Sequence, residues 1–222
     1  MKSRQMSESI IIGLIMAFSG GFMDAYTYVF RDKVFANAQT GNIILFGLNL
    51  SSGDFSKAVE HLFPILAFTA GIFTAQLFRM HFKKRPHFHW RQLSLIAEIM
   101  IIIAVSFMPQ SLNITANSLI SFACGIQVQT IRKIRGNAIA TTMCTGNLRT
   151  ASDLLCSYLH SKNGDDLKKG LFYCVTIAVF MLGAVAGKII TDIWGMTAIL
   201  ASALLILACF IIMFIDEKEL EG

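Results

Sequence analysis

Long apolar stretches recur along the whole chain, separated by short polar or basic connections. An α-helix rises about 1.5 Å per residue, so roughly 20 apolar residues cross the roughly 30 Å of hydrocarbon in a bilayer. The pattern therefore predicts an all-α polytopic membrane protein. Its six long transmembrane helices are expected at 9–30, 58–79, 92–108, 114–131, 171–190 and 194–215.

Two shorter segments, at 35–50 and 138–159, are partly polar and carry the same motif. The first contains Thr40-Gly41-Asn42, and the second contains Thr145-Gly146-Asn147, at an offset of 105 (145 minus 40). Polar groups that occur twice at matching positions in so apolar a chain mark these segments as candidates for the functional site.

Other matches follow in the same order and predict an internal repeat. At the offset of 105 Gly20 corresponds to Gly125, and Asp24 corresponds to Gln129. We therefore expect a single integral membrane domain, 1–222, built from related halves at 9–108 and 114–215. Small-residue pairs and tryptophans also match between the halves: Gly71 and Ala75 with Gly183 and Gly187, and Trp90 with Trp194.

The two motif-bearing segments decide the topology. If both enter the membrane and return, the chain has six full spans and inverted halves; if both cross, it has eight spans and parallel halves. With the loop at 79–91 in the cytoplasm, the six-span arrangement gathers more of the lysines and arginines inside, as the positive-inside rule requires. The eight-span arrangement remains the alternative.

Composition agrees with a membrane protein in the cell membrane. The chain is 55% hydrophobic and only 15% charged, whereas soluble domains are about 25% charged. The formal net charge of +5 lies in short connections between apolar stretches, where basic residues act as topology signals and contact lipid headgroups. We therefore expect the lipid bilayer as a partner and no nucleic acid.

Nothing in the residue spacing indicates an enzyme, a metal site or a cofactor. The five cysteines include no Cys-x-x-Cys pair and are expected to be small buried hydrophobic side chains. His81, His87 and His89 lie among basic residues, where they are expected to face water or headgroups.

The candidate substrate-binding residues are those of the two repeated motifs and the polar positions that precede them. Glycine lets backbone groups turn toward a cavity, and threonine and asparagine add donors and acceptors that can replace a solute's water. In the alternative interpretation these polar side chains only bond neighbouring helices. The candidates are Asp24, Gln39, Thr40, Gly41, Asn42, Gln129, Thr145, Gly146 and Asn147.

Four of the charged residues lie in the interior of membrane segments, Asp24 among them. Asp24 and Glu98 could carry a proton or meet a cation, because a lone carboxylate in hydrocarbon is costly. Arg149 and Asp153 are four residues apart and are expected to pair on one helix face.

The function that this pattern favours is a small-solute transporter or permease with a central cavity lined by the two segments. A small molecule or ion is then the expected substrate. The alternative is a non-transporting membrane scaffold that binds another protein. Its small-residue helix faces also allow a homodimer.

The first half combines the run Gly20-Gly21-Phe22-Met23-Asp24-Ala25 with the later Thr40-Gly41-Asn42 and the Gly53-Asp54 turn. A chain with these features resembles the YoaK-like family of uncharacterised bacterial multi-pass membrane proteins. The resemblance extends over essentially the whole chain and implies class and location, with no chemistry. The second half departs from it in the basic Arg132, Lys133 and Arg135, and in Gln129 at the position of Asp24.

Overall fold

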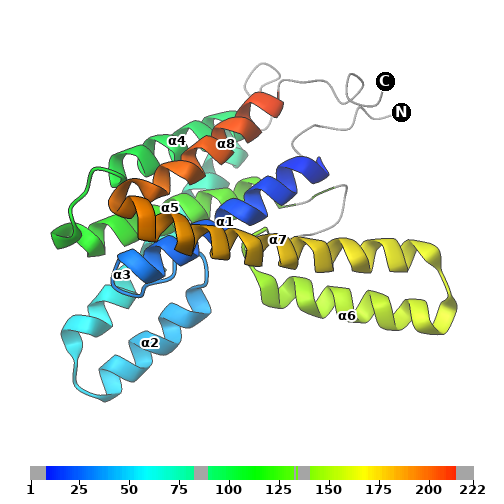
Figure 1. Cartoon of the computed structure of the whole chain (residues 1–222), viewed down its shortest axis with the longest axis horizontal. Coiled ribbons are helices and arrows are strands. Elements are labelled where there is room, and N and C mark those ends of the chain that lie inside the picture. Colours follow the sequence, from blue (N-terminus) through cyan, green and yellow to red (C-terminus); the bar gives the residue numbers. More distant parts are fainter. Residues whose placement is uncertain (1–8, 83–89, 133, 135–140, 214–222) are drawn as a thin grey trace.

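The computed structural model describes residues 9–82, 90–132, 134 and 141–213, and its regular elements there are helices (Figure 1). The prediction of an all-α protein is confirmed for this part of the chain. The α-helices are α1 (Ile10–Phe30), α2 (Gln39–Ser51), α3 (Phe55–Phe82), α4 (Trp90–Val105), α5 (Asn113–Thr130), α6 (Cys144–Ser161), α7 (Gly164–Trp194) and α8 (Leu200–Ile212). Short 3₁₀ turns, η2 (Gln110–Leu112) and η3 (Gly195–Ile199), precede α5 and α8.

The helix boundaries follow the predicted segments in most places. Helices α2 and α6 begin at the two Thr-Gly-Asn motifs. Helix α7 begins at Gly164, earlier than the predicted 171, because the Asn163 side chain caps its first turn by accepting from the amide of Asp165. The basic residues at 83–89 and the start of the predicted segment at 138 lie outside the described residues.

Three helical stretches in the described part are long and apolar enough to cross a membrane. They are Ile10–Phe30, Phe55–His81 and Gly164–Ile212. Helices α4 and α5, which the sequence predicted as further long spans, are not among them. Helix α5 lies inside the bundle and buries Asn117, Ser121 and Gln127 there.

Large apolar side chains cover the outer face of the bundle. Phe73 on α3 is 66% exposed and Met181 on α7 is 59% exposed. Ile43 and Ile44 on the short helix α2 are also exposed. Exposed apolar surface on this scale is typical of a protein that contacts lipid, so the described part has the surface and helices of a membrane protein.

A buried arginine ties one end of the bundle together. The Arg31 side chain is fully buried, although it directly follows α1. Its Nε donates to the Tyr26 hydroxyl at 3.1 Å, and its Nη2 donates to the carbonyl of Val105 at 3.1 Å. Its Nη1 donates to the carbonyl of Pro109 at 3.3 Å and to Oδ1 of Asn113 at 3.0 Å. The ends of α1 and α4 and the start of α5 therefore meet here, at what we call the Arg31 end.

Contacts near both ends fix the directions of the long helices. Phe30 lies against Gly195, so α7 also finishes at the Arg31 end. The Cys209 thiol lies 4.0 Å from the carbonyl oxygen of Ile12, so α8 runs away from that end. Helix α3 begins there, because Glu60 lies in electrostatic range of Asp32. Helices α1, α4 and α7 therefore run toward the Arg31 end, and α3, α5 and α8 run away from it (Figure 1).

Glycines bring the backbones of α1 and α7 into direct contact. A Cβ atom on Gly21 would lie 1.9 Å from the carbonyl oxygen of Phe180, and one on Gly183 would lie 2.0 Å from that of Phe18. Both distances are far below van der Waals contact, so no other residue fits without moving a backbone.

The crossing of α3 with α5 uses the same kind of contact. A Cβ atom on Gly71 would lie 2.1 Å from the carbonyl oxygen of Phe122, and one on Gly125 would lie 2.2 Å from that of Phe68. In each crossing, each glycine faces the carbonyl group of a phenylalanine on the opposite helix. That phenylalanine lies three residues before the glycine that its own helix contributes to the crossing. The two crossings therefore correspond contact for contact.

Alanine at a crossing glycine should destabilise the fold strongly. We expect Gly21→Ala and Gly183→Ala each to lower the free energy of unfolding by about 1–3 kcal/mol, because the added methyl group forces two backbones apart. Thermal unfolding of the purified protein in detergent, followed by circular dichroism, measures the effect.

The matched control is Gly47→Ala on α2, where an added Cβ atom meets nothing within 4 Å. It should leave stability within about 0.5 kcal/mol of the wild type or raise it, since alanine favours helix more than glycine. Equal melting temperatures for Gly21→Ala and Gly47→Ala would contradict the close crossing.

Candidate functional site

After α1 the chain turns back along that helix instead of leaving the bundle. Asp32 and Lys33 adopt positive φ angles of 63° and 58° at the turn. The Asn37 amide then donates to Oδ1 of Asp24 at 2.6 Å, and Asn37 Nδ2 donates to the carbonyl oxygen of Gly20 at 3.2 Å. Helix α2 therefore begins beside the middle of α1 and runs back toward the Arg31 end.

Asp24 supplies the N-terminal cap that α2 lacks in its own sequence. The residue at the cap position is Ala38, whose side chain makes no capping bond. The Asp24 carboxyl group is buried, accepts from Asn37, and also lies in hydrogen-bonding range of the amides of Ala36 and Ala38. A carboxylate at a helix N-terminus satisfies free amides and complements the helix dipole.

Of the other polar side chains of the first motif, some bond the loop before α2 and one is exposed at the surface. Asn42 is fully buried, and it accepts from the Phe35 amide at 3.0 Å while donating to the Phe35 carbonyl at 2.7 Å and to Gln39 at 3.0 Å. Asn42 and Gln39 therefore hold the loop before α2 in place. Thr40 is exposed, and Gly41 makes room for the Phe35 ring.

The second motif reaches the same region from the opposite direction. Thr141 and Thr142, just before α6, are buried, and the Thr142 methyl group is so close to Gly20 that a Cβ there would lie 2.8 Å from it. Cys144, the first residue of α6, lies in electrostatic range of Asp24. Helix α6 then runs toward the end opposite Arg31, so the two short helices diverge from one region in the middle of α1.

The structure brings together only some of the predicted site residues. Asp24, Gln39 and Asn42 cluster at the start of α2, and Asn147 is buried near the start of α6. Thr145 and Gly146 are exposed. Gln129 lies elsewhere, where its side chain donates to Gln76 on α3.

Asn37, Thr141 and Thr142 are central to this region and were missed by the sequence analysis. The signal for two of them was present: Asn37 precedes Thr40 by three residues, as Thr142 precedes Thr145. The hydroxyl oxygens of Thr141 and Thr142 have no hydrogen-bond partner in the described part of the chain.

The charged pair predicted on the second segment is confirmed. Arg149 Nε lies 3.9 Å from Asp153 Oδ2, and both side chains are more than 70% exposed. Such an exposed pair contributes little to stability.

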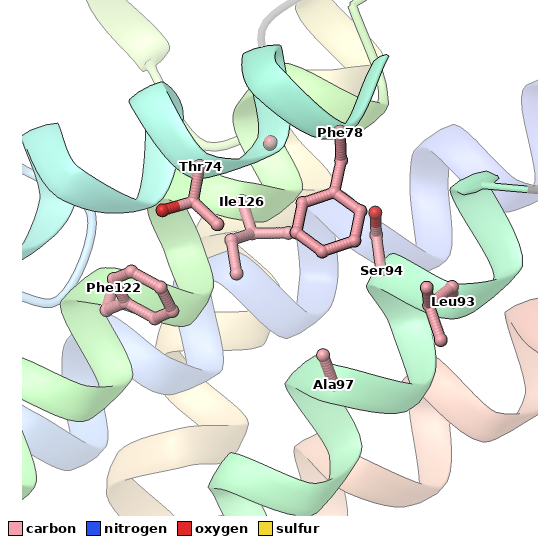
Figure 2. Close-up of a pocket in the computed structure, with 8 residues that line it drawn as sticks. Thr74, Phe78, Leu93, Ser94, Ala97, Phe122 and Ile126 are labelled. Atoms are coloured by element: carbon pink, nitrogen blue, oxygen red, sulfur yellow. The ribbon is translucent and has the colours of Figure 1, made fainter. Parts of the chain in front are cut away.

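A separate groove of about 170 Å³ lies between α3, α4 and α5 (Figure 2). Its lining is mostly apolar, with Phe78 from α3, Leu93 and Ala97 from α4, and Phe122 and Ile126 from α5. None of the Thr-Gly-Asn residues contributes to it. This groove therefore suits an apolar chain better than a polar solute.

Comparison with known proteins gives one family. Residues 12–212 match the family described as "Protein of unknown function (DUF1275)". No curated protein and no solved structure matches the chain. The match agrees with the resemblance to an uncharacterised membrane-protein family drawn from the sequence.

Removing the carboxyl group of Asp24 should release the start of α2. In Asp24→Ala the amides at 36–38 lose their acceptor, so we expect their hydrogen–deuterium exchange to become at least about tenfold faster, the equivalent of 1.4 kcal/mol. Mass spectrometry of peptides covering residues 35–42 measures the rates. Asp153→Ala, which removes an exposed carboxylate on α6, is the control and should leave these peptides unchanged. Unaltered exchange in Asp24→Ala would refute the capping role.

Proposed function

The chain belongs to the family described as protein of unknown function, DUF1275, and we propose that it is a multi-pass transporter of small polar solutes in the cell membrane. Its site lies where α2 and α6 begin, beside Gly20 and Asp24. The proposal involves no catalysis, metal or cofactor.

One observation carries the proposal: α2 and α6 start in the middle of the bundle and diverge toward opposite ends. Asn37 and Thr142, which precede them, both contact Gly20. Short helices that begin at mid-depth, one from each side, are the pattern of secondary transporters, where free backbone groups at the helix ends bind the substrate. Non-helical backbone at that depth needs a protein or water environment.

The proposed topology has six full spans and two partly inserted helices. Helix α2 has 13 residues and so rises about 20 Å, too little to cross roughly 30 Å of hydrocarbon. Its two flanking turns, at Asp32 and at Asp54, both lie near the Arg31 end, since Glu60 is in electrostatic range of both aspartates. The directions of the other helices support the same arrangement, because α1, α3, α4, α5, α7 and α8 alternate in direction along the chain.

The matched crossings support an internal repeat with inverted halves. Helix α1 pairs with α7 as α5 pairs with α3, through equivalent glycines and phenylalanine carbonyls. In this correspondence Gly21 is equivalent to Gly125, an offset of 104 (125 minus 21). The Thr-Gly-Asn motifs give an offset of 105, which makes Gly20 equivalent to Gly125 instead. The repeat then consists of α1–α4 and α5–α8.

The groups available to a solute lie mainly on the α6 side. Asp24 already occupies the start of α2, whereas α6 has no side-chain cap and no acidic residue in its first turn. The Thr141 and Thr142 hydroxyls are buried without a partner in the described part of the chain. Buried polar groups normally bind protein, water or ligand, so these hydroxyls and the first amides of α6 are the proposed solute contacts.

A non-transporting scaffold is the second candidate. Figure 1 shows α6 and the first half of α7 projecting from the bundle as a hairpin, which offers a surface for another protein. The glycines that suggested docking faces weigh against it, because Gly71 and Gly183 contact helices of the same chain. A homodimer would therefore use another surface.

The topology predicts that Lys33 and Lys57 lie on the same side of the membrane. Lys33→Cys and Lys57→Cys, each in a cysteine-free background, should react with a membrane-impermeant maleimide from the same side of oriented vesicles. Lys162→Cys, at the far end of α6, is the control and should react from the opposite side. Labelling of positions 33 and 57 from opposite sides would establish the eight-span alternative.

Solute binding should depend on Thr142. Purified protein is screened by thermal shift against neutral amino acids, monocarboxylates, sugars and nucleosides, and uptake of a stabilising compound is then measured in proteoliposomes. We expect Thr142→Val, which keeps the side-chain shape, to weaken binding of that compound at least about tenfold, the effect of one lost hydrogen bond of about 1.4 kcal/mol. Its thermal stabilisation and its uptake at low concentration should both fall accordingly. Thr69→Val, on the exposed face of α3, is the control. If no class of compound stabilises the protein, or none enters the proteoliposomes faster than it enters protein-free liposomes, the proposed transport function is wrong.

A further inference from the structure

Glu98 is a buried carboxyl group outside the region assigned to the solute. It lies in the middle of α4, and its side chain is fully buried. Both of its carboxyl oxygens have no hydrogen-bond partner in the described part of the chain. An ionised carboxylate in such surroundings is very costly. Its resting form is therefore either a neutral acid or a carboxylate that holds a bound cation.

The neighbours of Glu98 favour a proton over a metal cation. Among the described residues, the titratable groups that face it are the thiol of Cys124 on α5 and the thiol of Cys209 on α8. Sodium and other hard cations need several oxygen ligands, and thiols are poor substitutes. No group of three or more metal-binding side chains occurs in the described ranges. From α3 and η3, no described side chain forms a bond to the carboxyl oxygens.

Cys124 connects this carboxyl group with the proposed solute region. It lies in electrostatic range of both Glu98 and Asp24, and beside the Asn37 side chain. A change of charge at Glu98 therefore changes the electrostatic potential at Cys124, which lies next to the start of α2. The equivalent position on α8, 104 residues later (202 minus 98), is Ser202, which is also buried without a partner in the described part.

We propose that Glu98 is a proton-binding site, which takes up a proton from water to form the neutral acid and returns it when water reaches α4. The carboxyl group binds one proton per cycle, and no other bond changes. Its use in driving solute movement rests on the proposed transport function, but proton binding itself does not. Intramembrane carboxyl groups of this kind are the usual proton carriers of pumps and transporters.

Infrared spectroscopy of the protein in lipid nanodiscs, without any solute, tests the site. We expect a carbonyl band of a protonated carboxylic acid that shifts in D₂O and disappears as the pH is raised. Glu98→Gln should lose this band completely, whereas Asp24→Asn should keep it. Glu98→Asp, a second variant that retains the acid, should show the band at a shifted frequency.

Three results would overturn the proposal. The band could persist in Glu98→Gln, be absent from the wild type, or neither exchange in D₂O nor respond to pH, which is the behaviour of a sealed structural acid. If the band responds to D₂O and pH but the protein moves no solute, the proton site is supported and only the proposed transport function is refuted. If transport is real, Glu98→Gln should also flatten the pH dependence of uptake.

Discussion

The structure depends on two places where helix backbones touch. At both crossings a side chain larger than hydrogen would overlap a carbonyl group of the facing helix, as at Gly21 and Gly125. Lipid tails are as apolar as leucine, so close packing of backbones, and not burial of apolar side chains from water, holds helices together in a membrane. The crossings place α1 and α5 at the centre, and the loops that return into the bundle then have protein to bond with.

Hydropathy predicted the helical class, most helix limits and the start of both short helices, because these depend on local composition. It placed α5 correctly, but α5 is not among the described helices that are apolar enough to cross a membrane. A helix enclosed by other helices has no need to be apolar, and Asn117, Ser121 and Gln127 are buried within the protein. Hydropathy also set α7 to begin late, since Asn163 and the acidic first turn stabilise a polar extension of that helix.

The arrangement of the candidate site residues was predictable only in part. The repeated motif located the two helix starts, yet Asn42 bonds the loop before α2 and Gln129 lies on another face of the bundle. The roles of Asn37 and Thr142 depend on the chain folding back to Gly20, which no local pattern encodes. The one-residue difference in the repeat has the same origin, since helix packing matches Gly21 with Gly125 while the polar motif matches Gly20.

Enclosure of Arg31 alters the charge that this end of the protein presents. Its guanidinium group counts as a cation along the sequence, but it does not reach the surface. Of the exposed lysines near the same end, Lys33 follows Asp32, Lys57 lies 3.3 Å from Asp54, and Lys188 pairs with Asp192. Apart from Glu60, the described charges there are balanced at short range, and balanced pairs create little field at a distance. In the proposed transporter, selection between ions of either sign would therefore fall mainly to the interior.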